Sequence, residues 1–163
     1  MAATAPAAVV PTFAAMHRAI NDLHDALEAL AGSSEGSNEW ARAVLLTHAS
    51  YAIAEDFLGG EQPTLRSVRP EWRTSPKALL AVAERVTDLL PDVSAAWAMR
   101  GDACMGIAMG SSIASDFYEK AEALAPEGPV RASLAAKKEA ASALFLTNLG
   151  IAGEQLEKMQ SGA

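Results

Sequence analysis

Apolar residues recur along the early part of the chain with the alternating three- and four-residue spacing of helices that bury one face. Two such stripes occur, one within residues 12–32 and one within residues 38–58. The first consists of Phe13, Met16, Ile20, Leu23, Leu27 and Leu30, and the second of Trp40, Val44, Thr47, Tyr51, Ala54 and Leu58. Each set falls on one side of a helix. Further apolar residues widen the second stripe, so we expect that helix to be covered on two sides.

Residues typical of helix starts and stops mark the boundaries of the expected helices along the chain. Side chains that can accept a hydrogen bond from a first helical turn stand at the expected starts: Thr12, Ser37 or Asn38, Ser75 before Pro76, and Asp92 or Ser94. The predicted helices span 13–32, 38–58, 76–90, a stretch from 92 or 94 to 109, 113–125 and 130–159, with a kink or break in the last at Gly150 or Gly153. The sequence therefore predicts an all-α fold of about six antiparallel helices.

The remaining segments are read as an arm and a loop. Residues 1–11 are rich in Ala and Pro and are expected to form a disordered arm. Residues 59–75 hold two prolines and three arginines without a sustained period, so we expect a long connection, and long connections inside a compact domain are often functional. The length of the chain fits one domain, which we place at residues 12–160.

A repeat signature follows in the later half. The segments PDVSAAWAMRGDAC and FYEKAEALAP place Trp97 and Gly101 on one helix, Phe117 on the next and Pro126 after it, and Pro91 lies 35 residues before Pro126. This arrangement resembles a tetratricopeptide repeat, best over residues 76–126. The resemblance implies a right-handed helical array that binds other proteins, with these residues serving helix packing.

The sequence departs from the tetratricopeptide pattern at several positions. Cys104 stands where the family has a large aromatic residue, and the next repeat would place Ala132, Ala136 and Glu139 at its signature positions. The last helix is therefore interpreted as a cap. The helices over 13–32 and 38–58 carry no repeat signature, so only their periodicity links them to the array.

Charge narrows the choice of partners. The net charge is −7 and the isoelectric point is near 4.9, which argues against a nucleic-acid or anionic-membrane surface. The one locally basic stretch contains Arg66, Arg69, Trp72 and Arg73. These residues could dock an acidic partner protein, since arginine and tryptophan are enriched at binding hot spots. Alternatively, Trp72 folds back over the helices and the arginines are solvated, where they could pair with the acidic first half of the chain.

A peptide-gripping surface would need cationic residues on the inner face of the array. There the helix that follows residue 92 offers Arg100, which we add to the candidate partner-binding residues.

Three histidines offer a different class of function. His17 and His24 lie seven residues apart on one flank of the first helix, and with His48 they could form a metal site in a helical bundle. The simpler interpretation is that the first two are half-exposed surface residues, since no metalloprotein motif accompanies them. We expect no metal and no cofactor.

Catalytic motifs and targeting signals are missing from the sequence. It has no glycine-rich phosphate loop and no nucleophile-elbow pattern, so we expect no enzymatic activity. A single cysteine, Cys104, excludes an internal disulfide and fits a reducing compartment, for which the cytoplasm is the expectation and an organelle lumen an alternative. No apolar run is long enough to span a membrane, and the first ten residues lack the basic residues of a targeting peptide.

The sequence thus predicts a non-enzymatic interaction module or scaffold, a subunit or adaptor of a larger assembly. Its partners are expected to be other proteins. The alternatives are a helical-bundle metalloprotein that uses the three histidines and a bundle that carries a small apolar ligand.

Overall fold

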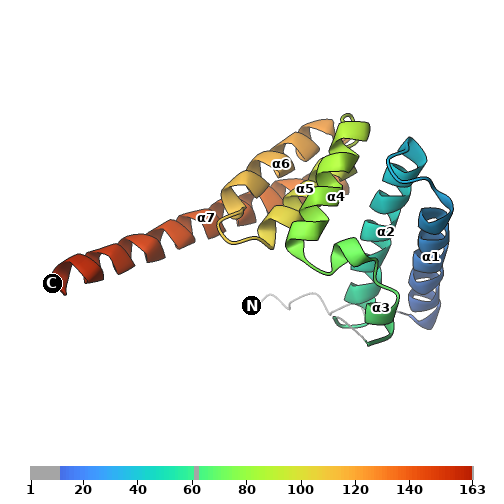
Figure 1. Ribbon diagram of the computed structural model, residues 1–163, viewed down its shortest axis with the longest axis horizontal. Helices are drawn as coiled ribbons and strands as arrows, with labels where there is room; N and C mark the ends of the chain where they lie inside the picture. The colour runs from blue at the N-terminus through green and yellow to red at the C-terminus, as the bar shows by residue number, and fades with distance from the viewer. Residues whose placement is uncertain (1–11, 61–62, 163) are drawn as a thin grey trace, which may run out of the picture.

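The computed structural model describes residues 12–60 and 63–162, and every regular element in them is helical. The elements are α1 (Phe13–Gly32), α2 (Asn38–Phe57), α3 (Pro63–Ser67), the 3-10 turn η1 (Glu71–Arg73), α4 (Pro76–Leu89), α5 (Ser94–Met105), α6 (Ser111–Leu124) and α7 (Pro129–Ser161). They form a row with α1 at one end, and α7 projects from the other end (Figure 1). The predicted all-α fold is confirmed, while the expected arm over residues 1–11 lies outside the described residues.

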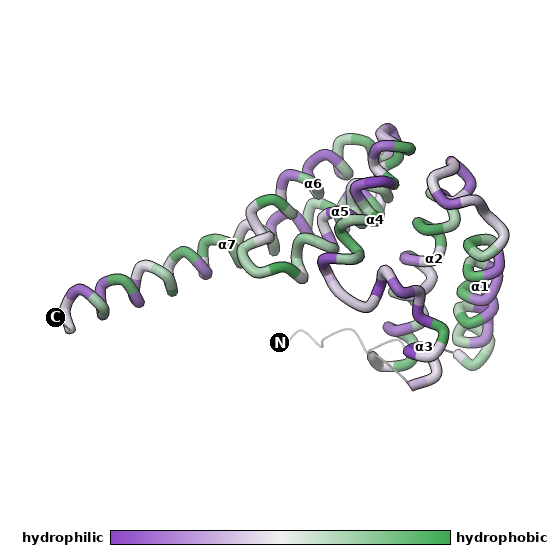
Figure 2. Tube along the Cα trace, viewed as in Figure 1, coloured by the Kyte–Doolittle hydropathy of each residue, from purple (hydrophilic) through white to green (hydrophobic). Residues whose placement is uncertain are grey.

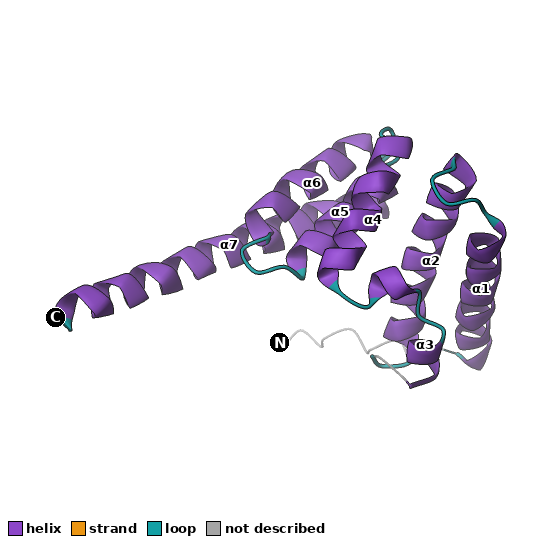
Figure 3. Cartoon of the chain, viewed as in Figure 1, coloured by secondary structure: helices purple, strands orange, loops and turns teal. Residues whose placement is uncertain are grey.

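Short connections join most of the helices (Figure 3), and three of the expected N-caps are present. The hydroxyls of Thr12, Ser37 and Ser75 accept hydrogen bonds from the backbone N–H three residues later, at 3.2, 3.0 and 3.1 Å. At the start of α5 the expectation is wrong, because Val93 is the N-cap and makes no side-chain capping bond. The Ser94 hydroxyl instead donates to the carbonyl of Ala121 at 2.7 Å, which ties α5 to α6.

The expected long loop over residues 59–75 is shorter than predicted, because it contains α3 and η1. Each is about one turn long, too short to produce a periodic pattern in the sequence. Leu65 anchors α3, since its side chain is buried and its carbonyl accepts a hydrogen bond from the hydroxyl of Tyr51. Residues 61–62 of this segment are outside the described part.

Two helix ends also differ from the expectation. α5 ends at Met105 rather than at 109, because the chain turns back sharply before α6. Met109 has a φ of 62°, and a Cβ on Gly110 would lie 2.1 Å from the carbonyl oxygen of Cys104, so the turn requires glycine at position 110. α7 runs unbroken through Gly150 and Gly153, and no neighbouring atom lies within 4 Å of the position that a Cβ would take at either glycine.

Three apolar clusters hold the row together. The first joins α2, α4 and α5, the second joins α5, α6 and α7, and the third joins α1, α2 and α3. α2 contributes to two of them, with Trp40 and Val44 in the first and Tyr51 in the third. The expectation that this helix is covered on two sides is confirmed.

The residues that carry the repeat resemblance pack at the joint of α5 and α6. The rings of Trp97 and Phe117 have their centroids 6.0 Å apart, and Pro126 follows the end of α6. A Cβ on Gly101 would lie 2.6 Å from Cε1 of Tyr118, so this glycine lets the two helices approach closely. These contacts fit a repeat-like packing, and membership of the tetratricopeptide family stays a prediction.

Polar and apolar residues alternate along the helices, including the projecting part of α7 (Figure 2). Within the described residues, no helix combines the length and the apolar character needed to cross a membrane.

Candidate functional site

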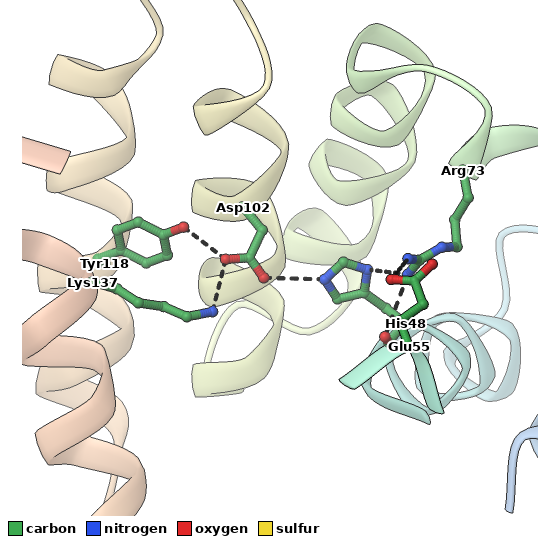
Figure 4. Close-up of polar contacts among 6 residues, drawn as sticks. All are labelled: His48, Glu55, Arg73, Asp102, Tyr118 and Lys137. Atoms are coloured by element: carbon green, nitrogen blue, oxygen red, sulfur yellow. Dashed lines mark hydrogen bonds and ion pairs between the residues drawn. The ribbon is translucent and has the colours of Figure 1, made fainter. Parts of the chain in front are cut away.

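A chain of polar side chains crosses the row of helices and centres on Asp102 of α5 (Figure 4). His48 of α2 donates from Nε2 to Oδ2 of Asp102 at 3.1 Å. Tyr118 of α6 and Lys137 of α7 both donate to Oδ1, at 2.7 and 2.9 Å. One carboxylate therefore connects the three consecutive helices α5, α6 and α7 with α2, which lies much earlier in the sequence.

Arg73 continues this chain on the other side of His48. Its Nη1 donates to Nδ1 of His48 at 3.1 Å and also lies 3.4 Å from the His48 carbonyl oxygen. Because a guanidinium offers only donors, Nδ1 must be the acceptor, and the ring proton is therefore assigned to Nε2. Both ring nitrogens of His48 are thus engaged within the protein.

Arg73 is itself held by α2. Its guanidinium lies 4.4 Å from the ring centroid of Tyr51, a cation–π contact, and its Nη2 is 3.6 Å from Oε2 of Glu55. Burial lowers the pKa of Arg73, and the Glu55 carboxylate opposes that effect. The contacts fix the segment after α3 against the end of α2.

The electrostatics of Asp102 favour its charged form. Burial by itself raises the pKa of this carboxyl, but the hydrogen bonds from His48, Tyr118 and Lys137 together outweigh burial and leave the pKa below its ordinary value. Burial raises the pKa of the Tyr118 hydroxyl, and the neighbouring Asp102 carboxylate raises it further. The polar chain is therefore stable as an ion-paired network at neutral pH.

This network is suited to holding helices rather than to catalysis. A general base needs a free ring nitrogen that faces a substrate, and both nitrogens of His48 are occupied. Cys104 is buried, and burial raises the pKa of its thiol, which disfavours the reactive thiolate.

Arg100, the candidate cationic residue of α5, is engaged by neighbouring helices. Arg100 faces away from Asp102, since residues two apart on a helix point to nearly opposite sides. It donates to the Thr87 hydroxyl at 3.0 Å, lies 3.5 Å from Glu84 and stacks 4.5 Å from the centroid of the Phe117 ring. Arg100 therefore joins α5 to α4 and α6 rather than facing an open inner surface.

The predicted docking element is largely used inside the chain. Trp72 packs against the first apolar cluster, and Arg69 and Arg73 pair with Glu55 at 3.7 and 3.6 Å. Arg66 is exposed on α3. Of the two interpretations of this segment, the contacts match the one in which Trp72 covers the helices, except that Arg69 and Arg73 are not solvated: their side chains are 21 and 12% exposed.

The structure does not bring the three histidines together. His17 is exposed beside Asn21, at 3.2 Å, and His24 lies beside Asp25, whereas His48 belongs to the Asp102 network. Among the described residues, the one group close enough to share an ion is His24, Asp25 and Glu28, all of them exposed on α1. The three-histidine metal site is therefore wrong, because the bundle places His48 on the side of α2 that faces α5.

Two cavities lie near the C-terminal end of α2. One, of about 590 Å³, is polar and is lined by two acidic residues, Glu55 and Asp56, and two basic residues, Arg69 and Arg73, so its formal charges balance. The other, of about 370 Å³, is apolar and lies between α1, α3 and the end of α2, with Leu65 in its wall. This apolar cavity is the candidate location for the alternative of a small apolar ligand, at the lower end of the size range for such sites.

The distal half of α7 exposes several large apolar side chains. Every residue from Leu149 to Gly162 is exposed, and Leu149, Ile151, Leu156 and Met159 expose 46, 50, 56 and 76% of their surface. The first half of α7 packs on α6 through Leu134 and Ala141. The projecting half has no such support (Figure 1).

The sequence interpretation missed Asp102, Tyr118, Lys137 and Glu55 as a connected set. One signal was present, because Lys137 follows Asp102 by 35 residues, the same spacing that separates the two prolines of the repeat signature. The pairing of His48 with Asp102 had no comparable signal. It depends on α2 lying beside α5, which no local pattern reveals.

Compared with protein-family models, with curated proteins and with solved structures, the chain gives no match.

Proposed function

We propose that the protein is a non-enzymatic interaction module that joins a larger assembly through the distal half of α7. The observation that carries this proposal is the run of exposed apolar side chains on a helix that projects from the array. The partner is a polypeptide that presents an amphipathic helix with an uncharged apolar stripe, the usual complement of such a surface.

Physical stability supports the proposal. Isolated helices shorter than about 12 to 15 residues are marginal in water, and most helical stability in proteins comes from packing one face. Residues 149–161 form such a short extension, and they contain Gly150 and Gly153, each of which weakens a helix. A partner that covers Leu149, Leu156 and Met159 would supply the missing packing.

The Asp102 network supports the proposal in a different way. It links α2, α5, α6 and α7 into one body through contacts to a single carboxylate. Lys137 fixes the first half of α7 in this network, so the direction in which the second half projects is set by the body. A scaffold needs such a rigid base for its binding element.

Affinity capture with matched variants tests the proposal. Leu156→Glu places a charge on the apolar stripe of α7, and Ile151→Glu places the same charge on another side of the same exposed helix. A specific partner that is captured by the wild type and by the Ile151 variant, and lost with the Leu156 variant, is the expected result. Identical capture by all three chains, or none, together with no binding of a hydrophobic dye by the wild type, would overturn the proposal.

A further inference from the structure

The exposed apolar residues of α7 form a regular stripe. Leu149, Ala152, Leu156 and Met159, here named the α7 seam, follow one another at spacings of three, four and three residues. This is the pattern by which two helices pack side by side. The seam lies on the side of α7 from which Leu134 and Ala141 pack against α6, because Ala152 follows them by 18 and 11 residues, about five and three helical turns. It therefore begins where the support from α6 ends.

The charges around the seam are arranged for pairing with a like surface. The residues that flank the seam are uncharged, namely Asn148, Gly153, Gln155 and Gln160. The charged residues of this segment, Glu154, Glu157 and Lys158, fall on the outer side of the helix. A second copy of the same helix would thus meet no like charge across the contact, the feature that usually prevents identical helices from pairing.

We infer that the occupant of the α7 seam is the α7 seam of a second copy of this chain, packed antiparallel. The inference rests on the proposed function and names its partner. In the antiparallel arrangement Leu149 faces Met159 of the second copy, and Ala152 faces Leu156. A small residue then meets a large one in each central layer, whereas a parallel pair would set Ala152 against Ala152 and leave a void.

The packed helices from α1 to the first half of α7, here called the body, also favour the antiparallel orientation. α6 reaches the neighbourhood of Ser142, where the Ser115 and Ser142 hydroxyls are 2.8 Å apart, and it occupies the seam side of α7 there. In a parallel pair both bodies would crowd this one end. The antiparallel pair sends them to opposite ends of the shared helices and keeps the bodies of two acidic chains, each chain of net charge −7, apart.

The contact is short, and its strength follows from its length. An overlap from residue 149 to residue 159 is about 16 Å long at 1.5 Å per residue. Interfaces that bury less than about 1,200 Å² in total are weak and reversible. We therefore expect a dimer that forms with rising concentration rather than a permanent one.

Sedimentation velocity over a range from about 1 to 300 μM tests the inference. The mass of the wild type is expected to rise from 17.0 kDa toward twice that value. Leu156→Glu is expected to keep the chain monomeric over the whole range, and Ile151→Glu, the matched control on the same exposed helix, is expected to dimerise as the wild type does. A dimer that survives Leu156→Glu would overturn the inference.

Cysteine cross-linking tests the orientation in the same full chain. The native Cys104 is buried and does not compete. A mixture of Leu149→Cys and Met159→Cys chains is expected to form a disulfide-linked pair, while Leu149→Cys alone is expected to form none. Cross-linking by Leu149→Cys alone would show a parallel pair and overturn the antiparallel assignment.

The outcomes also separate this inference from the proposed function. A wild type that stays monomeric at 300 μM, yet binds a hydrophobic dye that Leu156→Glu abolishes, rules out the second copy and leaves a different helix as the partner. A monomer that binds no dye contradicts both proposals.

Discussion

Two of the joints that α5 makes with its neighbours, those with α6 and with α2, are built on different principles. Toward α6 the joint is a matter of shape, because Gly101 lets the ring of Tyr118 lie against the helix backbone and Trp97 meets Phe117. Toward α2 an apolar contact around Met99 is combined with the polar chain from His48 to Asp102. A shape-based joint fails when volume is added, and a polar joint fails when a charge or a partner is removed.

The largest effect is expected at the joint of α5 and α6. Gly101→Val would drive a side chain into Tyr118, which is only 3% exposed and whose hydroxyl is held by Asp102. Overpacking of this kind costs about 3 kcal/mol of unfolding free energy. Urea or thermal unfolding would measure the loss.

Gly150→Ala is the control for that substitution. This glycine lies in a helix with nothing within 4 Å of its Cβ position, so alanine should stabilise α7 by up to about 1 kcal/mol. If Gly101→Val is as mild as Gly150→Ala, close approach does not govern the α5 and α6 joint.

Neutralising Asp102, at the centre of the polar joint, is expected to cost less unfolding free energy than overpacking at Gly101. Asp102→Asn removes the charge that His48, Tyr118 and Lys137 share. Removing one partner of a fully buried pair costs about 3 to 5 kcal/mol, and because the Asp102 side chain is 28% exposed we expect about 2 kcal/mol at neutral pH. Asp116→Asn changes the same charge on the exposed side of α6 and should leave the unfolding free energy within about 0.5 kcal/mol.

Acid should erase the difference between the wild type and the Asp102→Asn variant. The pKa of Asp102 in the folded protein lies below its ordinary value of 3.8. The carboxylate therefore stabilises the fold fully above that ordinary value, and the contribution disappears as the pH falls through the lower, folded-state pKa. Unfolding curves from pH 7 to about pH 2 should converge for the two chains, and a constant gap would contradict the role given to the charge.

The contrast between the two joints also explains how far the sequence could predict the structure. The α5 and α6 joint left a local signature, since Trp97, Gly101 and Phe117 follow a recognisable spacing. The caps at Thr12, Ser37 and Ser75 were likewise local and were predicted correctly. Elements of one turn, such as α3, gave no period and were missed.

The polar chain was not predictable in the same way. His48 and Asp102 are separated by 54 residues, and their contact depends on how α2 lies beside α5. The sequence shows that His48 lies on a helix, but it does not show which helix packs beside it. His48 was therefore a candidate metal ligand. The sequence left two interpretations open for Trp72 and Arg73, docking to a partner or contact with the chain itself, and both residues are held against the array.

The smallest effect is expected at the outer link of the polar chain, where His48 connects Arg73 to Asp102. His48→Leu keeps an apolar volume but removes both the acceptor of Arg73 and one donor of Asp102, which should cost about 1 kcal/mol, the typical net value of such hydrogen bonds.

His48→Gln is the matched variant, because its amide can accept from Arg73 through oxygen and donate to Asp102 through nitrogen. Denaturant unfolding at neutral pH should place the glutamine variant closer to the wild type than the leucine variant. If leucine is tolerated as well as glutamine, the joint of α2 and α5 is held by the apolar cluster around Met99, and the polar chain only accompanies it.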